Sequence, residues 1–422
     1  MTETLPVYCL ECAVQSYDWG KLGKESKVAH FASKFTDIDN KKPYAELWMG
    51  THPNGPSKIA STNTFLKDAI SSNPIQHLTA AIAHNYDNDL PFLFKVLSVR
   101  KALSIQAHPD KKLGKELHEK YPTIYKDPNH KPEMAIAITD FEALFGFRPL
   151  NEIVSFLNEF PEFATLVGDA TVNKFLDSIR GQSETASPEE ITSNKVALKE
   201  LFAAVMMTDA NVVKESVEKM SRRVEREQRE TGDDDRTKEL IVRLSTQYPG
   251  DVGVFAVLML NYVKLNPGQA IFLGANEPHA YLFGDCVECM AASDNVVRAG
   301  LTPKFKDVPV LVNMLTYNYG PADKQILSPI RHSSTTVLYD PPIEEFSVLL
   351  TTLTRGNASE EFDPIIGPSV LIVTEGMGML VVDNQERKEE LWPGGVYFIG
   401  AGIKIRIDTK NGLVAYRALC TI

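Results

Sequence analysis

The alternation of apolar and polar positions divides the chain into three blocks. Up to about Arg148, short apolar runs such as LPFLFKVLSV and MAIAIT are separated by clusters of Asn, Asp, Pro and Gly, a pattern typical of strands joined by turns. From 149 to 252, apolar residues recur every three or four positions, in NEIVSFLNEF, ATVNKFLDSI, NKVALKELFAAVMM and ELIVRLSTQY, which predicts helices. Strand-like patterns then return and persist to the C-terminus. The chain is therefore predicted to be mainly β, with an all-α insertion.

Local signals refine this division. One helix is predicted inside the first β-rich block, from Phe65 to Asn85. Within the helical block, Ser187 followed by Pro-Glu-Glu predicts an N-cap, a proline at the first helical position and an acidic first turn. The run SRRVEREQRETGDDDR, residues 221–236, mixes both charge signs and is interpreted as a solvated helix end and loop.

A faint internal repeat links the two β-rich blocks. PGQAIFLGA at 267–275 is echoed by PGGVYFIGA at 393–401, and a Pro-Gly turn, short apolar strand and Gly-Ala exit are typical of the later part of a cupin jelly roll. A jelly roll packs two antiparallel sheets, and its interior can hold a small ligand. The first copy leads to His279, whereas the second leads to GIKIRI, without a histidine. We therefore predict two cupin-type jelly-roll β-barrel domains, a catalytic one formed by 1–148 and 253–324 and a C-terminal one without a metal site at 325–422, together with a helical domain at 149–252.

Charge and apolar content narrow the possible functions. With 55 acidic and 44 basic residues the 422-residue chain carries a net charge of −11, which argues against a nucleic-acid partner. A phosphorylated substrate would need local cations, because the overall field repels it. The start MTETLPVYCLECAVQ lacks a secretory pattern, and the longest apolar stretch, Val252–Val263, is shorter than the about 20 residues that span a bilayer. We expect a cytoplasmic protein with no membrane partner.

The cysteines form two CxxC pairs, Cys9 with Cys12 and Cys286 with Cys289, while Cys420 stands alone. A structural zinc site would be one interpretation of such pairs. Both pairs lie in sequence that looks extended, and residues three apart on a strand point to opposite faces. Free thiols are therefore predicted.

Candidate metal ligands come from three segments. Gln106 and His108 are two apart in a predicted strand, so their side chains are expected to emerge on one face together with Ser104. Two imidazoles with carboxylate and amide oxygens suit zinc, although iron and manganese also accept them. The candidate ligands are Gln106, His108, His130, Glu133 and His279.

Fixed charges surround these candidates. Arg298 and Lys304 lie on the same segment as His279, while Lys131 and Lys95 lie on or near the other metal-site segments, so that a small anion could be bound. Other residues allow two interpretations. Asp294 with Asn295 suits a binding role or a simple turn, and Trp19 and Tyr281 suit sugar stacking or a core position.

The three segments SIQAHP (104–109), YKDPNHKPEM (125–134) and HAYLFGDCVECMAASDNVVRAGLTPK (279–304) closely resemble the signatures of the type I phosphomannose isomerases. Shorter matches, YAELWMGTHPNG and PFLFKVLSV, extend the resemblance across the N-terminal third. The resemblance implies one zinc ion per chain held by Gln106, His108, Glu133 and His279, with His130 not a ligand, and a catalytic role for Arg298.

The resemblance also implies a reaction, the interconversion of mannose 6-phosphate and fructose 6-phosphate through an enediol(ate), which supplies mannose 6-phosphate for GDP-mannose synthesis and protein glycosylation. This chemistry needs a base, an electrophile for the developing oxyanion and a phosphate anchor. A guanidinium stays protonated, so Glu288, Lys131 or His52 are the candidate bases. The expected substrate contacts are Lys304, Lys95, Tyr281, Asp294, Trp19, His52 and Ser104.

Two other functions are kept beside this one. A metal-dependent cupin dioxygenase would use a redox metal and an apolar pocket, and a non-catalytic sugar-binding cupin would not need the whole ligand set together with Arg298. The expected partner is a small sugar phosphate, and the expected state is a monomer.

Overall fold

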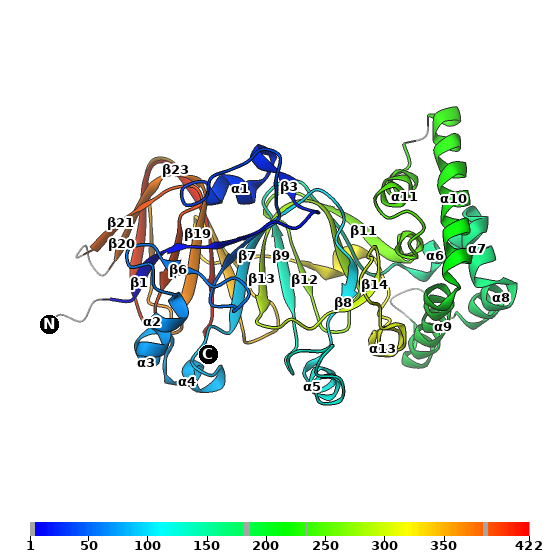
Figure 1. Cartoon of the computed structure of the whole chain (residues 1–422), viewed down its shortest axis with the longest axis horizontal. Coiled ribbons are helices and arrows are strands. Elements are labelled where there is room, and N and C mark those ends of the chain that lie inside the picture. The colour runs from blue at the N-terminus through cyan, green and yellow to red at the C-terminus, as the bar shows by residue number, and fades with distance from the viewer. Residues whose placement is uncertain (1–4, 180–185, 233, 383–386, 422) are drawn as a thin grey trace.

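The computed structural model describes residues 5–179, 186–232, 234–382 and 387–421. Two large β-sheets and a group of helices lie in a row along the long axis of the molecule (Figure 1). The sheet that carries the candidate ligands is in the middle, between the C-terminal sheet and the helical insertion. The predicted class, mainly β with an all-α insertion, is confirmed.

The middle sheet has eleven strands, arranged around the long strand β13. The C-terminal half of β13 pairs with β7 and β9, and its N-terminal half pairs with β8 and β10, so this one strand belongs to both layers of the sheet. The strands are β2 (Ala13–Gln15), β5 (Glu46–Met49), β7 (Phe92–Val99), β8 (Ile105–Ala107), β9 (Glu133–Ala137), β10 (Phe141–Phe147), β11 (Leu260–Leu265), β12 (Ala270–Leu273), β13 (His279–Ala291), β14 (Val297–Gly300) and β15 (Ile326–Leu327).

A bulge in β13 decides which of its side chains face the interior. The register with β10 shifts between Tyr281 and Phe283, and Gly284 follows with φ 111°. Tyr281 and Cys286 share one hydrophobic cluster although five positions apart, a spacing that places residues on opposite faces of a regular strand. The extra residue of the bulge explains the change of face. A Cβ at position 284 would lie 2.3 Å from the carbonyl oxygen of Asp140, so the close approach requires glycine.

The second sheet has ten strands and includes the first strand of the chain. β1 pairs with β22 and with β6, so N-terminal residues extend the C-terminal sheet. The domain ranges given above stay a prediction. The first strand, β1, lies in the range 1–148 but pairs with β22 of the range 325–422. The strands are β1 (Val7–Glu11), β6 (Lys58–Ile59), β16 (Ile330–Arg331), β17 (Thr336–Tyr339), β18 (Ser347–Phe362), β19 (Ser369–Gly376), β20 (Gly378–Val382), β21 (Arg387–Leu391), β22 (Val396–Ile399) and β23 (Ile405–Leu419); β3 (Lys21–Leu22) and β4 (Pro43–Tyr44) form a separate pair.

The sequence repeat corresponds to a repeated structure. The apolar runs form β12 in the middle sheet and β22 in the second sheet. Each strand follows a glycine with positive φ, 83° at Gly268 and 88° at Gly394, which a Pro-Gly turn permits.

Helices fill the predicted insertion. Ser187 caps α9 with a full capping box, and Pro188 is its first residue, as predicted. Residues 221–231 of the charge run form the end of α10, which stops at Gly232 with φ 65°; residue 233 lies outside the described residues. The insertion helices are α6 (Leu150–Glu159), α7 (Pro161–Val167), α8 (Asp169–Ser178), α9 (Pro188–Met207), α10 (Ala210–Thr231) and α11 (Arg236–Gln247).

The single helix expected from Phe65 to Asn85 is wrong. The structure has three short helices there, because Pro74 has no backbone N–H to donate and Thr79 adopts φ 94°. They are α2 (Leu66–Ser72), α3 (Pro74–Leu78) and α4 (Ala80–Asn85), and the remaining helices are α1 (Lys27–Ala32), α5 (Lys111–Lys120), α12 (Gly253–Ala256) and α13 (Val308–Met314), with 3₁₀ turns at Gly23–Glu25 and Ala322–Gln325.

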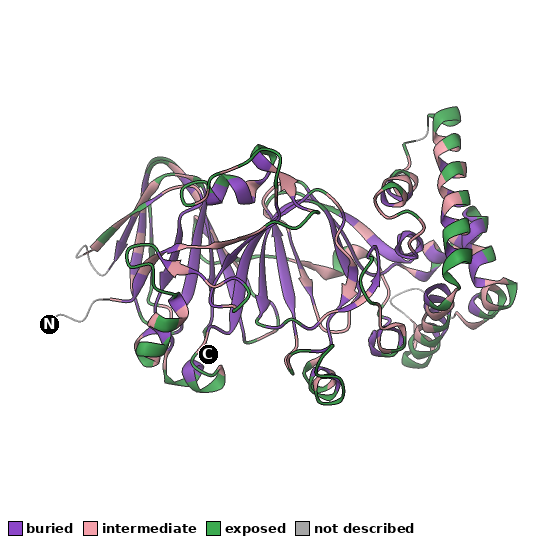
Figure 2. Ribbon diagram, in the orientation of Figure 1, coloured by how far each residue is buried: buried purple, intermediate pink, exposed green. Residues whose placement is uncertain are grey.

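The two sheets pack face to face through an apolar core. Val96 and Val287 of the middle sheet belong to the same buried cluster as Val348 and Phe398 of the second sheet. The strands are accordingly buried along most of their length, while the outer faces of the helices are exposed (Figure 2). Of the helices that the structure describes, none combines the length and apolar character needed to cross a membrane.

The cysteines follow the prediction. All five are free. On β13, Cys286 belongs to a cluster on one face and Cys289 to a cluster on the other, so this pair cannot chelate one ion.

Candidate metal centre

Three of the predicted ligands form one buried cluster in the middle sheet. His108, Glu133 and His279 have potential ligand atoms within 4.8 Å of one another. Glu133 lies between the two imidazoles: its Oε1 is 3.4 Å from Nε2 of His108, and its Oε2 is 3.4 Å from Nε2 of His279. Two ligands of a tetrahedral zinc ion with bonds of about 2.1 Å are separated by a similar distance, roughly 3.4 Å.

Backbone carbonyls orient both imidazoles. Nδ1 of His108 donates to the carbonyl oxygen of Asn295 at 2.6 Å, and Nδ1 of His279 donates to that of Glu277 at 3.1 Å. Each Nε2 is then a lone-pair acceptor that points toward Glu133. Both Nε2 atoms and Oε2 of Glu133 are buried without a hydrogen-bond partner, a condition that needs an explanation in a folded protein. A bound metal ion would satisfy all three, so the residues fit such an ion.

Gln106 is placed beside this cluster by strand register. It pairs with His279 on β13 and with Arg298 on β14. Directly paired residues of antiparallel strands share one face of the sheet. His279, Gln106 and Arg298 therefore form a row across three strands, with Gln106 in the position where a fourth ligand is predicted.

The protonation of the cluster suits metal binding. Burial, and to a lesser extent Lys131, lowers the pKa of His108 to about 4, although Glu133 opposes this. Burial by itself would raise the pKa of Glu133, but Lys131 and His108 hold it well below its ordinary value. Nζ of Lys131 lies 2.9 Å from Oε1 of Glu133. A neutral imidazole and an ionised carboxylate are the forms that bind metal.

A second polar row lies on the same face. Lys95 is opposite Glu288 on one side and Trp48 on the other. Its Nζ is 3.2 Å from Glu288 and 3.4 Å from Glu46, and 4.9 Å from the centre of the Trp48 ring. Burial and the charge of Glu133 raise the pKa of Glu288, while Lys95 opposes them. Glu288 is therefore a carboxyl group whose proton is held more tightly than usual.

Glu46 and Trp48 were missed by the sequence reasoning. They belong to the matched motif YAELWMG and are two apart in β5, so they share a face. Only the pairing of β5 with β7 brings that face next to Lys95.

Arg298 and Lys304, the two cations of the segment 279–304, lie in different environments. Arg298 is half-buried, its pKa is lowered by burial, and it forms no ion pair or side-chain hydrogen bond with any described residue. Its guanidinium is thus free to bind an anion. Lys304 is exposed beyond the end of β14, where Thr302 accepts a bond from its backbone N–H, and no contact joins it to the described residues of the cluster.

His52 and Asp294 lie together at the edge of the site. Nε2 of His52 is 3.5 Å from Oδ1 of Asp294, and the His52 ring meets Trp48 edge-on with centroids 5.0 Å apart. The bond from His52 lowers the pKa of Asp294 despite some burial. The structure therefore connects Asp294 to the row of Lys95 through His52 and Trp48.

The remaining predicted contacts are placed as follows. Tyr281 is buried beside the cluster, with its ring centre 6.4 Å from that of His279, and burial together with Glu288 raises its pKa well above the ordinary value. Trp19 stacks on Tyr17 at 5.8 Å and packs against the cluster of apolar residues that contains Tyr281. Ser104 is partly buried just before β8.

Two polar residues of the motifs lie outside the cluster. His130 bonds through Nε2 to Glu345 at 2.7 Å, so its ring is occupied by the C-terminal part of the chain. Asp285 faces the other way on β13 and accepts from Ser98 at 2.6 Å and Lys21 at 2.5 Å.

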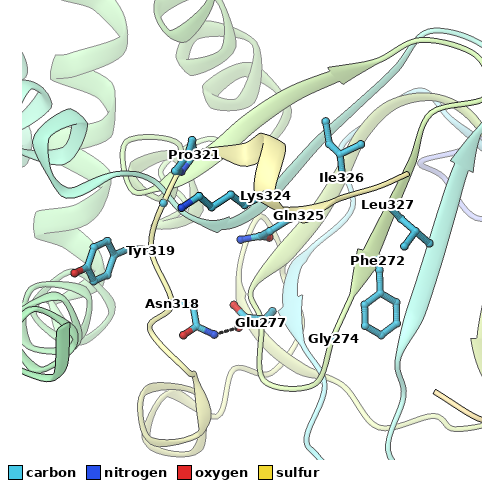
Figure 3. A pocket seen from close by; sticks show the side chains of 11 residues that line it. Phe272, Gly274, Glu277, Asn318, Tyr319, Pro321, Lys324, Gln325, Ile326 and Leu327 are labelled. Atoms are coloured by element: carbon cyan, nitrogen blue, oxygen red, sulfur yellow. Dashed lines mark hydrogen bonds between the residues drawn. The ribbon is translucent and has the colours of Figure 1, made fainter. Parts of the chain in front are cut away.

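A separate cavity of about 440 Å³ lies against the loop before β13. Glu277 lines it and accepts a hydrogen bond from Asn318 at 2.8 Å, as Figure 3 shows, while its backbone carbonyl faces His279. None of the predicted substrate contacts lines this cavity. The residues that line it are Phe272, Gly274, Glu277, Asn318, Tyr319, Gly320, Pro321, Lys324, Gln325, Ile326 and Leu327.

Comparison with known protein families identifies three parts of the chain. Models of type I phosphomannose isomerase match residues 7–150 as the catalytic domain, 166–260 as the helical insertion domain and 336–385 as the C-terminal part. The chain belongs to the type I phosphomannose isomerase family.

Curated relatives and solved structures share nearly its full length. The mannose-6-phosphate isomerase of Saccharomyces cerevisiae is 46% identical over 98% of this chain and 98% of its own, and that of Emericella nidulans is 44% identical over 99% and 97%. An arginine-to-alanine mutant of phosphomannose isomerase from Salmonella typhimurium superposes with a TM-score of 0.81 at 33% identity, covering 99% of this chain and 100% of that one. A mannose 6-phosphate isomerase bound with zinc and yttrium gives the same TM-score, identity and coverage.

Proposed function

We propose that this chain is a zinc-dependent aldose–ketose isomerase that interconverts mannose 6-phosphate and fructose 6-phosphate. The observation that carries the proposal is the buried His108–Glu133–His279 cluster, together with Arg298, which shares a cross-strand row with His279 and has no ion-pair partner among the described residues. The activity printed in the names of the full-length relatives supports the substrate. The mannose 6-phosphate formed would feed GDP-mannose synthesis and protein glycosylation.

In this proposal one zinc ion is held by His108, Glu133, His279 and Gln106. When bound, zinc polarises a carbonyl or hydroxyl oxygen of the sugar as a Lewis acid. Lys131 contributes indirectly: its ammonium neutralises part of the charge of Glu133 and keeps this carboxylate ionised.

Proton transfer is assigned to Glu288. Aldose–ketose isomerisation through an enediol(ate) requires a group that takes a proton from one carbon and returns it to the next. A carboxyl group whose pKa is raised by burial is a stronger base when ionised and is easily reprotonated. Lys95 remains at 3.2 Å to stabilise the ionised form. Lys131 is less suited as a base, because it is already paired with Glu133.

Negative charge on the substrate is met by Arg298 and Lys304. Arg298 has no acidic partner among the described residues, so its charge is available to the developing enediolate. Lys304 is exposed and suits the phosphate group. Asp294 and His52 would contact sugar hydroxyls from the edge of the site.

The test is a coupled assay with mannose 6-phosphate on protein as purified, after chelation, and after zinc is returned. Activity should disappear with chelator and return with zinc. Absence of isomerase activity in zinc-loaded protein would refute the proposal. Oxygen consumption with iron would favour a dioxygenase, and binding of sugar phosphate without turnover would favour a sugar-binding module.

A further inference from the structure

A network of hydrogen bonds centred on Asp127 and Asn295 joins two of the motif segments. The carboxylate of Asp127 accepts from the hydroxyl of Ser293 at 2.8 Å, from the backbone N–H of Asp294 at 2.7 Å and from that of Asn129 at 3.0 Å. In return, the side-chain amide of Asn295 donates to the carbonyl oxygens of Asp127 at 2.7 Å and Asn129 at 2.8 Å. The two segments are thus tied in both directions.

The part of the network around Asn295 and Ser293 is buried. Asn295 is 1% exposed and Ser293 is 3% exposed. The hydroxyl of Ser293 also accepts from the backbone N–H of Asn295 at 3.2 Å, which closes the turn. Buried donors and acceptors that satisfy one another hold a loop in one conformation, since breaking one bond leaves a buried polar group without a partner.

This network ends at the metal ligands. The backbone carbonyl of Asn295 is the acceptor for Nδ1 of His108 at 2.6 Å, so the position of Asn295 fixes the ring that presents Nε2 to Glu133. Glu133 itself follows Asn129 by four residues, and Arg298 follows Asn295 by three. The same bonds therefore set the relative positions of three parts of the site.

We propose that Asp127 and Asn295 are positioning residues that preorganise the metal site, although neither side chain contacts the ligand atoms. The inference rests on the proposed metal dependence. Among the described residues, the side-chain amide nitrogen of Asn295 bonds only within the network and its Oδ1 has no hydrogen-bond partner, while the atom that orients His108 is the backbone oxygen. The side chain of Asn295 can therefore act on the metal through the position of the backbone, whereas a negative charge introduced at this position would by itself favour a bound cation.

The decisive variant is Asn295→Asp, which keeps the size of the side chain but replaces two donated hydrogen bonds with repulsion from two carbonyl oxygens. Asp127→Asn tests the other end, because Ser293 donates to Oδ1 and the N–H of Asp294 donates to Oδ2, and an amide has an acceptor at only one of these two positions. Loss of partners that orient metal ligands costs about 10–100-fold in metal affinity. We expect a loss of this size for zinc, measured by competition with a chromogenic chelator.

Asp235→Asn is the matched control. Asp235 also accepts two backbone N–H groups, at 2.7 Å and 3.1 Å, but it caps α11 in the helical insertion. Its zinc affinity should equal that of the wild type. Ser293→Ala removes a single hydroxyl and gives a milder version of the test if Asn295→Asp unfolds the protein.

Folded Asn295→Asp or Ser293→Ala protein with wild-type zinc affinity would overturn the inference. An equal loss in Asp235→Asn would also overturn it, because the effect would then be general destabilisation. Wild-type protein that binds no zinc would instead refute the proposed metal dependence itself.

Discussion

Truncation of Arg298 separates stabilisation of the transition state from binding of the substrate. In the structure the guanidinium has no acidic partner among the described residues, so Arg298→Ala leaves no orphaned carboxylate behind. The side chain also donates no hydrogen bond to these residues. We therefore expect little change in thermal unfolding, and the kinetic effect can be assigned to the reaction.

The magnitude follows from the position of Arg298. It shares a row with Gln106 and His279, so it lies on the face of the metal cluster rather than at the exposed end of the segment where Lys304 lies. Loss of one preorganised electrostatic partner of a developing oxyanion costs about 10²–10³ in rate, or roughly 3–4 kcal/mol of transition-state stabilisation. We expect kcat to fall by this factor, with KM changed much less.

The assay is steady-state kinetics with mannose 6-phosphate, with Lys304→Ala as the matched variant. Lys304→Ala should raise KM and leave kcat near the wild-type value, because an exposed lysine beyond the strand suits the phosphate. A large rise in KM with near-normal kcat for Arg298→Ala would refute the reasoning and make Arg298 a phosphate ligand.

Three further predictions follow from buried charges. His279→Ala should lose bound zinc and activity while far-ultraviolet circular dichroism shows the helical insertion still folded; full activity without detectable metal would contradict the ligand assignment. Glu288→Gln should lower kcat by about 10²–10⁴-fold and remove the acidic limb of the pH profile of kcat, and an unchanged profile would exclude Glu288 as the proton carrier. The hydrogen bonds and charges of His130 and Lys111 outweigh burial and lower the pKa of Glu345 to about 2. The stability that Glu345 contributes is therefore fully present above the pKa of the unfolded chain, 4.5, and is lost as pH falls through about 2. The difference in Tm between wild type and Glu345→Gln should therefore shrink as pH falls from 4.5 to 2, and a constant difference would contradict this linkage.

Local periodicity was sufficient for the class of fold and for part of the site. The change from period two to a period of three to four residues predicted the helical insertion, because each helix must bury one stripe of apolar residues on its own. Ser187 could be predicted as a cap for a similar reason, since the capping box involves residues only three apart. The predicted same-face relation of Gln106 and His108 likewise depends only on strand geometry over three positions.

Tertiary structure decided what lies far apart in the sequence. The break of the expected helix at Asn73 and Thr79 shows that apolar spacing alone cannot predict backbone angles that the surrounding packing stabilises. Similarly, β1 becomes a strand of the C-terminal sheet by pairing with residues more than 380 positions away, such as Val7 with Ile399. The five residues of β1 carry no signal that identifies so distant a partner.

The metal centre depends both on local sequence and on tertiary structure. The sequence by itself determined which residues could bind a metal, because the chemistry of imidazole, carboxylate and amide belongs to the side chain. It could not determine that His279 and Glu288, nine positions apart on one strand, serve the same interior face. A regular strand with an odd separation would place them on opposite faces, and the bulge between Tyr281 and Phe283 reverses this. The bulge lies where the part of β13 paired with β10 meets the part paired with β7, and such pairing exists only in the folded chain.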